Sequence, residues 1–374
     1  MKKQKIIEFH ACERHGSEVS NQRSDRYIGD VARPVDFVLW HCRFEPFVTL
    51  CDSKWTLYCC DQETVLLVYS KKSLKDYQAR HCPFIYVSQF SDAKLVAQLS
   101  LDQFIQFAKT KLPSEPKWST IAYISNTPRS GTTLLTSMLQ ASSKLICLSE
   151  LAVFTNLAIE KELVELNKYN GSKSRQVLTE PRLLQFLRAI FAKICSEFNS
   201  DSVIVLKTQS NGGILVPQIS KAMNGRVKQI FMYRRYQPLH FAKLKPQTGL
   251  DYCAAVYIGP LVWFMEQQAV GITFHSLTFE DVIENPAKYV EKIFDKLEIF
   301  HKETPQTERR NLIETALEAM DTDSQSGSFL SQSHLENVSF TRLNDQLRNR
   351  YNEYVLKLGL TVQPALFTDK IVNF

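Results

Sequence analysis

Several signals that would assign the chain to a membrane or an export route are missing from its 374 residues. No window comes near the 18 uninterrupted apolar residues that a membrane-spanning helix needs, so we expect no membrane span. The basic segment Met1–Lys5 is not followed by an apolar stretch of signal-peptide length. We therefore expect no secretory signal and a cytoplasmic location.

Strong charge of one sign is also absent. The formal net charge is +6, and Lys and Arg cluster only in short pairs such as Lys2–Lys3 and Lys71–Lys72. A nucleic-acid-binding protein usually carries a concentrated basic stripe. We expect no nucleic-acid partner and only a weak general preference for anionic ligands.

Paired Cys-x-x-Cys spacing, which structural zinc sites usually show, does not occur. The nine cysteines are an odd number and cannot all pair with one another within the chain. His41–Cys42 and His81–Cys82 flank Cys59–Cys60, which makes zinc an alternative to consider. We expect reduced, buried thiols instead, with neither disulfides nor a metal site.

The first part of the chain is rich in β-forming residues. Residues 1–35 are polar and without clear periodicity, and they predict a loosely packed arm. Short apolar runs rich in Val, Phe, Tyr and Trp then predict strands joined by tight turns. These runs are Phe37–Trp40, Phe47–Leu50, Trp55–Cys60 and Thr64–Tyr69, with Phe84–Val87 as a further candidate. Ser100–Lys111 has helical spacing and ends before Pro113 and Pro116, which predicts a β-rich (α+β) domain over residues 1–115.

From residue 116 onward, apolar strands alternate with amphipathic helices. The predicted strands are Ile121–Ile124, Lys144–Leu148, Val203–Leu206, Val227–Tyr233 and Gly271–Leu277. A helix is predicted to begin near Gly131, and others to span Leu183–Phe198, Pro260–Gln268, Tyr289–Leu297 and Leu343–Leu358. This alternation predicts an α/β domain with a three-layer parallel sheet over residues 116–374.

The segment between the first of these strands and its helix reads Asn-Thr-Pro-Arg-Ser-Gly-Thr-Thr-Leu-Leu from Asn126 to Leu135. The first N–H groups of a helix have no internal partners, and the helix dipole favours an anion there. Gly131 lets the backbone approach a ligand closely, and Arg129 adds a permanent cation with a planar donor fork. Hydroxyl donors come from Ser130, Thr132 and Thr133. The segment therefore predicts a loop that binds phosphate or sulfate groups.

This loop lacks two parts of a nucleotide triphosphatase loop, which reads G-x-x-x-x-G-K-[ST]. Thr132 stands where the lysine would be, and Asn126 stands where the first glycine would be. A nucleotide kinase or hydrolase is therefore a disfavoured alternative.

The run Pro-Arg-Ser-Gly-Thr-Thr-Leu-Leu resembles the 5′-phosphosulfate-binding loop of sulfotransferases. It is closest to the form in tyrosylprotein sulfotransferases and their bacterial relatives. The resemblance implies a P-loop fold and 3′-phosphoadenosine 5′-phosphosulfate as donor and co-substrate, with no metal. It also implies an acceptor hydroxyl on a small molecule, a glycan or a protein. It extends over about residues 118–360, and the C-terminal Arg-Lys-Gly motif of cytosolic sulfotransferases is not present.

Three further segments match the family in order, and the last of them, Phe274–Val282 followed by Asn285-Pro286, implies a mainly structural role. Gln229–Arg234 resembles the strand whose terminal arginine holds the donor's 3′-phosphate, although Ala242 occupies the position of the family's serine. Arg235 or His240 is a candidate to compensate for that serine. Val203–Lys207 followed by Thr208 resembles the strand that ends in Lys-Thr, which implies that Lys207 reaches the bridging or leaving oxygen of the donor.

The resemblance also implies a general base for the acceptor hydroxyl. Glu150 lies 21 residues after Arg129, where the tyrosylprotein branch carries its catalytic glutamate. His240, His275 and His334 are the other candidates. We therefore predict a sulfotransferase with Glu150 and Lys207 as catalytic residues. The open alternative is a non-catalytic nucleotide-binding or interaction protein on the same fold. The acceptor and the oligomeric state are not readable from the sequence.

Overall fold

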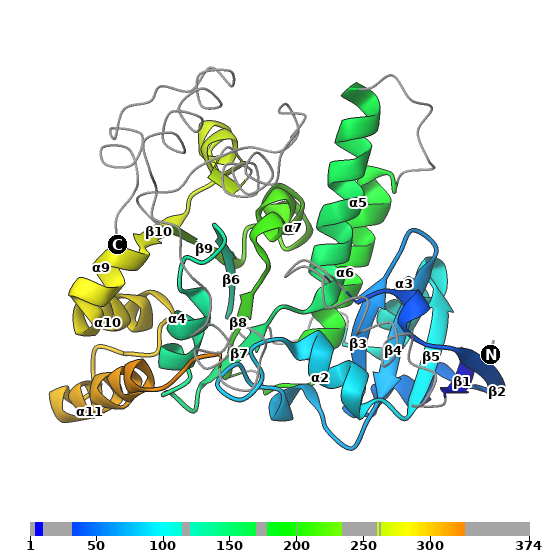
Figure 1. Ribbon diagram of the computed structural model, residues 1–374, viewed down its shortest axis with the longest axis horizontal. Coiled ribbons are helices and arrows are strands. Elements are labelled where there is room, and N and C mark those ends of the chain that lie inside the picture. The colour runs from blue at the N-terminus through cyan, green and yellow to red at the C-terminus, as the bar shows by residue number, and fades with distance from the viewer. Residues whose placement is uncertain are drawn as a thin grey trace, which may run out of the picture. The chain divides into compact units, whose positions relative to one another are not determined.

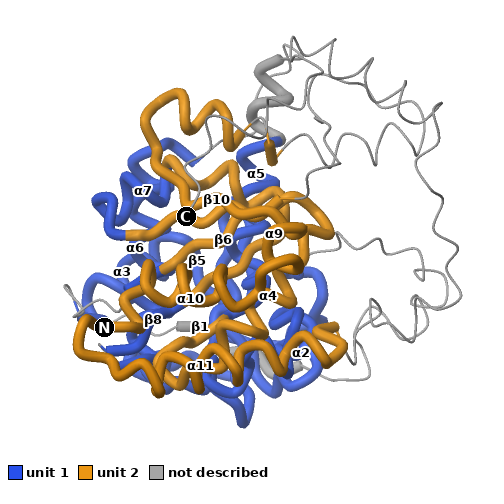
Figure 2. Tube along the Cα trace, turned by 90° about the vertical axis from the view of Figure 1, so that its left-hand side faces the viewer, with its two compact units in different colours: residues 1–121, 148–204, 218–226 blue, residues 122–147, 205–217, 227–374 orange. Residues whose placement is uncertain are grey.

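The computed structural model describes residues 4–9, 32–113, 120–169, 178–199, 201–233, 260–261 and 263–325. Within them the chain is a mixed α/β protein with two separate five-stranded sheets (Figure 1). Contacts group the chain into two compact units. Unit 1 comprises residues 1–121, 148–204 and 218–226, and unit 2 comprises 122–147, 205–217 and 227–374 (Figure 2). The predicted domains, 1–115 and 116–374, stay a prediction.

The N-terminal sheet is antiparallel, with strand order β2-β1-β5-β4-β3. Its strands are β1 Gln4–Phe9, β2 Leu39–Glu45, β3 Trp55–Cys60, β4 Thr64–Tyr69 and β5 Leu95–Ser100. The bounds of β3 and β4 are those predicted, because both strands are runs of aromatic and branched residues bounded by turn residues. The prediction of a polar arm over residues 1–35 was wrong for β1, which pairs with both β2 and β5.

Two predicted strands in this region are helical instead. Phe47–Cys51 is a 3₁₀ helix (η3) that buries Phe47 and Leu50, three residues apart. The helix α2, Ile85–Asp92, replaces the predicted strand Phe84–Val87 and buries Ile85 and Gln89, four residues apart. Apolar runs this short do not distinguish a strand from a helix turn. The predicted helix is confirmed as α3, Leu101–Lys111, and the Ser100 side chain caps it by accepting the Gln103 N–H.

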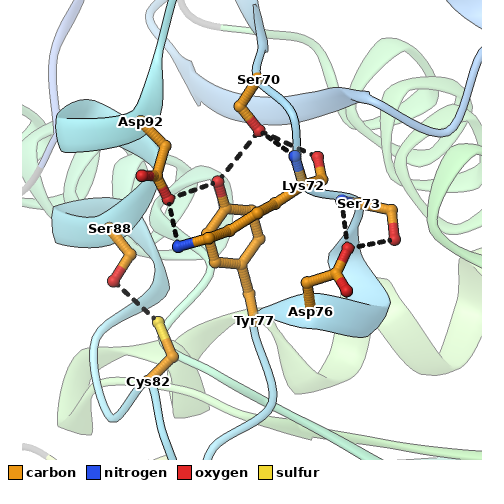
Figure 3. A network of polar contacts seen from close by, with 8 residues as sticks. All are labelled: Ser70, Lys72, Ser73, Asp76, Tyr77, Cys82, Ser88 and Asp92. Carbon is orange, nitrogen blue, oxygen red and sulfur yellow. Dashed lines mark hydrogen bonds and ion pairs between the residues drawn. The ribbon is translucent and has the colours of Figure 1, made fainter.

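A buried tyrosine fastens the segment after β4 to α2 (Figure 3). The Tyr77 hydroxyl lies 3.1 Å from the Ser70 hydroxyl and donates to the Asp92 carboxylate at 3.0 Å. Lys72 makes an ion pair with the same carboxylate at 2.9 Å and lies over the Tyr77 ring. Tyr77 directly follows the short 3₁₀ helix η4, Leu74–Asp76. Its contacts therefore fix the end of η4 to the residue after β4 and to α2.

Unit 1 also contains two long helices, α5 Ala152–Tyr169 and α6 Glu180–Cys195, which pack on β3 and α3. Asn156 of α5 accepts the Cys60 N–H at 3.1 Å. Just beyond α6, Glu197 makes a fully buried ion pair with Lys193 at 3.0 Å and accepts the Leu74 N–H at 3.3 Å. Burial raises the pKa of Glu197, and the charge of Lys193 opposes that shift.

The second sheet has the order β10-β9-β6-β8-β7, and its strands are parallel. They are β6 Ile121–Asn126, β7 Leu145–Ser149, β8 Val203–Lys207, β9 Val227–Tyr233 and β10 His275–Thr278. The N–H of Ile204 donates to Thr120 O at 2.8 Å, and that of Thr208 donates to Ile124 O at 3.1 Å. Donor and acceptor both advance by four residues, as parallel pairing requires. The predicted parallel sheet is confirmed, although β10 begins four residues later than predicted.

Helices lie between or after these strands. They are α4 Thr132–Leu139, α7 Val216–Ala222, α9 Phe279–Glu284, α10 Pro286–Lys296 and α11 Gln306–Leu317, with 3₁₀ helices η5 Ser210–Leu215 and η6 Glu318–Asp321. Of these, α4 and α10 correspond to predicted helices, whereas α7 and α11 were not predicted. Residues 260, 261 and 263–269 are helical too. The predicted helix Leu343–Leu358 lies outside the described residues. In the part of the chain that is described, no helix combines the length and apolarity needed to cross a membrane.

Two faces of the second sheet can be told apart within unit 2. Phe231 of β9 stacks on Phe264 of helix 263–269, with ring centroids 4.3 Å apart. Side chains alternate along a strand, so the neighbouring Met232 faces the opposite side. There its methyl group approaches Gly131, at the start of α4. Helix 263–269 and the start of α4 therefore lie on opposite faces of the sheet.

Candidate anion-binding loop

A tight loop joins β6 to α4. The strand continues two residues further than predicted, to Asn126, and the helix begins at Thr132. The Thr127 N–H donates to Met232 O at 3.0 Å, which ties the loop to β9. The first helical bond of α4 runs from the Leu135 N–H to Gly131 O. The amides of residues 132–134 precede that bond and point out of the helix start, as anion binding requires.

Gly131 is the helix N-cap, and two features of its position require glycine. Its φ is +82°, in the left-handed region that side chains rarely adopt. A Cβ at this position would also lie 2.6 Å from Cε2 of Phe279, the first residue of α9. The close approach of the loop backbone to the Phe279 ring therefore requires a residue without a Cβ at position 131.

The loop carries buried polar atoms that have no hydrogen-bond partner among the described residues. They are the hydroxyls of Thr127 and Ser130, both fully buried, and Oδ1 of Asn126. A buried hydroxyl without a partner costs about 1–3 kcal/mol. Each hydroxyl therefore has a donor proton that no described residue uses. Thr132 and Thr133 are buried in the first turn of α4 beside them.

Arg129 lies at the exposed tip of the loop. Its guanidinium Nη1 donates to Gln325 Oε1 at 3.3 Å. Gln325 follows η6, which packs against α4. The contact keeps the Arg129 side chain beside the loop, where a planar donor fork can serve a phosphate or sulfate group.

Lys207 ends β8 and is buried, with 4% of its surface exposed. The register of β8 against β6 places it level with Ile124. The hydroxyl of Tyr123, one residue earlier, donates to Gly212 O at 3.0 Å, so Tyr123 faces η5. By alternation, Ile124 and Lys207 face the other side of the sheet.

That other side is the one on which α4 begins. Gly213 of η5 approaches both Ser125 and Trp263, so η5 and helix 263–269 cover the same face. Gly131 lies on the opposite face, as does Lys207. Within unit 2, the start of α4 and the predicted lysine therefore lie on the same face of the sheet.

Glu150 lies between β7 and α5 and is buried, with 7% of its surface exposed. Its φ is +59°, and that of Arg129 is +57°. The other two non-glycine residues with positive φ in the described part of the chain, Asn224 and Glu298, follow the ends of α7 and α10, where this conformation is common. A positive φ in a non-glycine residue that does not follow the C-terminus of a helix is typical of functional positions. Glu150 belongs to unit 1, whereas the loop belongs to unit 2, so its role as base stays a prediction.

Of the other predicted residues, His275 lies at the opposite end of its strand and the rest lie outside the described residues. His275 begins β10, level with Ile230, whereas the loop follows the carboxyl end of β6. Burial, with the charges of Lys296 and Lys228, lowers its pKa to about 4, and it is neutral near pH 7. His275 thus lies at the amino end of its strand, and its candidacy as base stays a prediction. Arg234, Arg235, His240, Ala242 and His334 lie outside the described residues.

Sequence reasoning missed two neighbours of the loop. Phe279 packs on Gly131, and Gln325 bonds Arg129. Neither contact has a local signal, because each joins residues more than 140 positions apart in the chain. Within the described part of the chain, no group of three or more His, Cys, Asp or Glu side chains is placed to hold a metal ion.

Comparison with known proteins adds little to this geometry. No protein-family model matches the chain, and no curated protein matches it in sequence. Among solved structures, the chain is similar to the sulfotransferase STF9 from Mycobacterium avium. The identity is 11%, the match covers 70% of this chain and 82% of that chain, and the TM-score is 0.34. A likeness this distant assigns neither a family nor an activity to this chain.

Proposed function

We propose that the chain is a sulfotransferase, which moves a sulfuryl group from 3′-phosphoadenosine 5′-phosphosulfate to an acceptor hydroxyl. One observation carries this proposal. Two buried hydroxyls without partners, those of Thr127 and Ser130, lie in the loop between β6 and α4, and Lys207 is on the face of the sheet where α4 begins. Hydroxyls, helix amides and cations together favour a multiply charged oxyanion.

Each predicted residue has a role in this proposal. The loop residues Arg129, Ser130, Gly131, Thr132 and Thr133 hold the 5′-phosphosulfate group, and Arg234 holds the 3′-phosphate. Lys207 stabilises the negative charge that develops on the leaving phosphate oxygen. No metal takes part.

The reaction is an in-line displacement that depends mainly on positioning and charge stabilisation. The acceptor oxygen forms a bond to sulfur while the bond from sulfur to the donor's phosphate oxygen breaks. Glu150 accepts the proton of the acceptor hydroxyl. Adenosine 3′,5′-bisphosphate is the leaving group, and the sulfate ester is the product.

A second candidate is a non-catalytic nucleotide-binding or interaction protein. Ala242 favours it, because this position lacks the hydroxyl that the sulfotransferase family uses for the 3′-phosphate. Thr132 in place of the loop lysine speaks against a nucleotide kinase or hydrolase.

Calorimetric titration with adenosine 3′,5′-bisphosphate and with ATP plus magnesium separates these functions. We expect the bisphosphate to bind and ATP to bind weakly or not at all. Transfer of labelled sulfate from the donor to a panel of phenols, alcohols, glycans and tyrosine peptides then tests catalysis. Bisphosphate binding without transfer to any acceptor, or binding of neither nucleotide, would favour the non-catalytic protein. A preference for ATP with magnesium would favour a nucleotide kinase or hydrolase and overturn the sulfotransferase proposal. The acceptor class and the cytoplasmic location stay predictions until such measurements.

A further inference from the structure

The residue that follows Lys207 is held to β6 by both its backbone and its side chain. The Thr208 N–H and the Thr208 hydroxyl each donate to Ile124 O, both at 3.1 Å. Thr208 is buried, with 2% of its surface exposed. Its two bonds use both lone pairs of one carbonyl, two residues before the end of β6.

A second strand residue and a glycine enclose this threonine. The Tyr123 hydroxyl donates to Gly212 O at 3.0 Å. Burial raises the pKa of Tyr123, so its hydroxyl keeps its proton and stays a donor to Gly212 O. A Cβ at Gly212 would lie 2.6 Å from Thr208 Cβ, so only glycine allows η5 to approach so closely. The next glycine of η5 is also held in place, because the Gln267 amide donates to Gly213 O at 2.8 Å.

These contacts determine where the end of β8 lies. A lysine has four rotatable side-chain bonds, so the position of its ammonium group depends on a fixed backbone. The Thr208 N–H bond continues the ladder between β8 and β6 one residue beyond Lys207, and the hydroxyl bond adds a second restraint on the same carbonyl. The two bonds of Thr208 fix the residue next to Lys207. They fix it to β6, the strand that leads into the anion-binding loop.

We propose that Thr208, supported by Tyr123 and covered by Gly212, is a positioning residue that sets where the Lys207 ammonium group meets the anion in the loop. The inference rests on the proposed function, because it takes the loop and Lys207 to act on one anion. Thr208 itself does not contact the anion. Its effect passes through Lys207.

A double-mutant cycle tests this inference, with adenosine 3′,5′-bisphosphate affinity as the main readout. Thr208→Val removes the hydroxyl but keeps the side-chain shape, and Thr208→Ser is the matched control. We expect Thr208→Val to weaken binding by about threefold to tenfold, the range of one hydrogen bond, and Thr208→Ser to stay near wild type. In a Lys207→Ala background, Thr208→Val should have no further effect, because the two residues act as one unit.

Two results would overturn the inference. One is an equal loss from Thr208→Val with and without Lys207, and the other is no loss at all. If Thr208→Val does not fold by circular dichroism, Tyr123→Phe removes the supporting hydroxyl and serves in the same cycle. Sulfate transfer measured on the same proteins keeps the two proposals separate. Wild type that binds the bisphosphate but transfers no sulfate contradicts the proposed function, while the binding cycle still decides the role of Thr208. Wild type that does not bind the bisphosphate overturns both.

Discussion

The ring of Phe279 occupies the space that a side chain at Gly131 would need. The contact joins the start of α9 to the N-cap of α4, two elements that lie far apart in the sequence. The contact with Phe279 restrains the helix end of the anion-binding loop. The Thr127 N–H bond to Met232 O ties the strand end of the loop to β9.

Gly131→Ala should therefore destabilise the fold and abolish binding of adenosine 3′,5′-bisphosphate. We expect a loss of about 3 kcal/mol or more in the free energy of unfolding, from the positive φ together with the clash with Phe279. Urea denaturation measures the stability, and calorimetry measures the binding.

Gly271→Ala is the matched control for this change. Gly271 has a similar φ of +88°, but no atom lies within 4 Å of where its Cβ would be. We expect only the backbone cost, about 1–2 kcal/mol, and unchanged binding. Equal losses for the two variants would contradict the packing argument.

Replacing Tyr77 by Phe should weaken unit 1 without affecting the anion-binding loop. The change removes the hydroxyl that meets Ser70 and Asp92 and leaves the ring in place. We expect a loss of about 1–2 kcal/mol in unfolding free energy. Tyr69→Phe serves as the comparison, since no hydrogen bond of the Tyr69 hydroxyl is present among the described residues. Unchanged stability in Tyr77→Phe would show that the two hydrogen bonds of the Tyr77 hydroxyl in Figure 3 contribute nothing to folding.

Glu150→Gln should separate catalysis from binding. The amide has nearly the shape of the carboxylate but cannot accept the acceptor's proton. We expect sulfate transfer to fall by about 100-fold or more, with bisphosphate affinity within about twofold of wild type. Glu284→Gln, an exposed change on α9, should leave both unchanged. Transfer that survives in Glu150→Gln would mean that another residue is the base.

The lowered pKa of His275 predicts that the protein loses folding stability in acid. Its pKa is about 4 in the folded protein, below the value of 6.5 for an unperturbed histidine, so the unfolded chain binds the proton more readily. The contribution of His275 is present above about pH 6.5 and is lost as the pH falls towards 4. Because the side chain is only half-buried, we expect about 1–2 kcal/mol after solvent screening. The difference in unfolding free energy between wild type and His275→Gln, measured from pH 8 to pH 4, should shrink over this window. A constant difference would be the contrary result.

The sequence predicted the elements of the loop well but not what surrounds them. The strand before it is a run of apolar residues, and the Gly131 position has a clear backbone requirement, so strand, loop and helix were readable locally. The side of the sheet that Lys207 faces depends on the register of β8 against β6, which no local pattern encodes. Phe279 and Gln325 reach the loop only through the tertiary fold.

Errors in the N-terminal region have a similar cause. The helix α2 was predicted as a strand because one of its two buried residues is the polar Gln89, whose amide donates to Thr56 Oγ1 and Leu57 O. Hydrophobic spacing cannot detect a buried amide whose partners lie on another element. The strand β1 was missed because its pairing with β2 and β5, rather than an apolar pattern of its own, defines it.

The buried ion pair of Lys193 and Glu197 has a consequence for how the sequence can change over evolution. Loss of either charge leaves the other without a counter-ion in the protein interior, at a cost of about 3–5 kcal/mol, whereas replacing both by apolar residues can be neutral. Among related sequences, the two positions should therefore vary together, with a charged pair or an apolar pair but rarely a mixture. The Leu74 amide, which bonds Glu197, adds a backbone contact that favours keeping the charged pair.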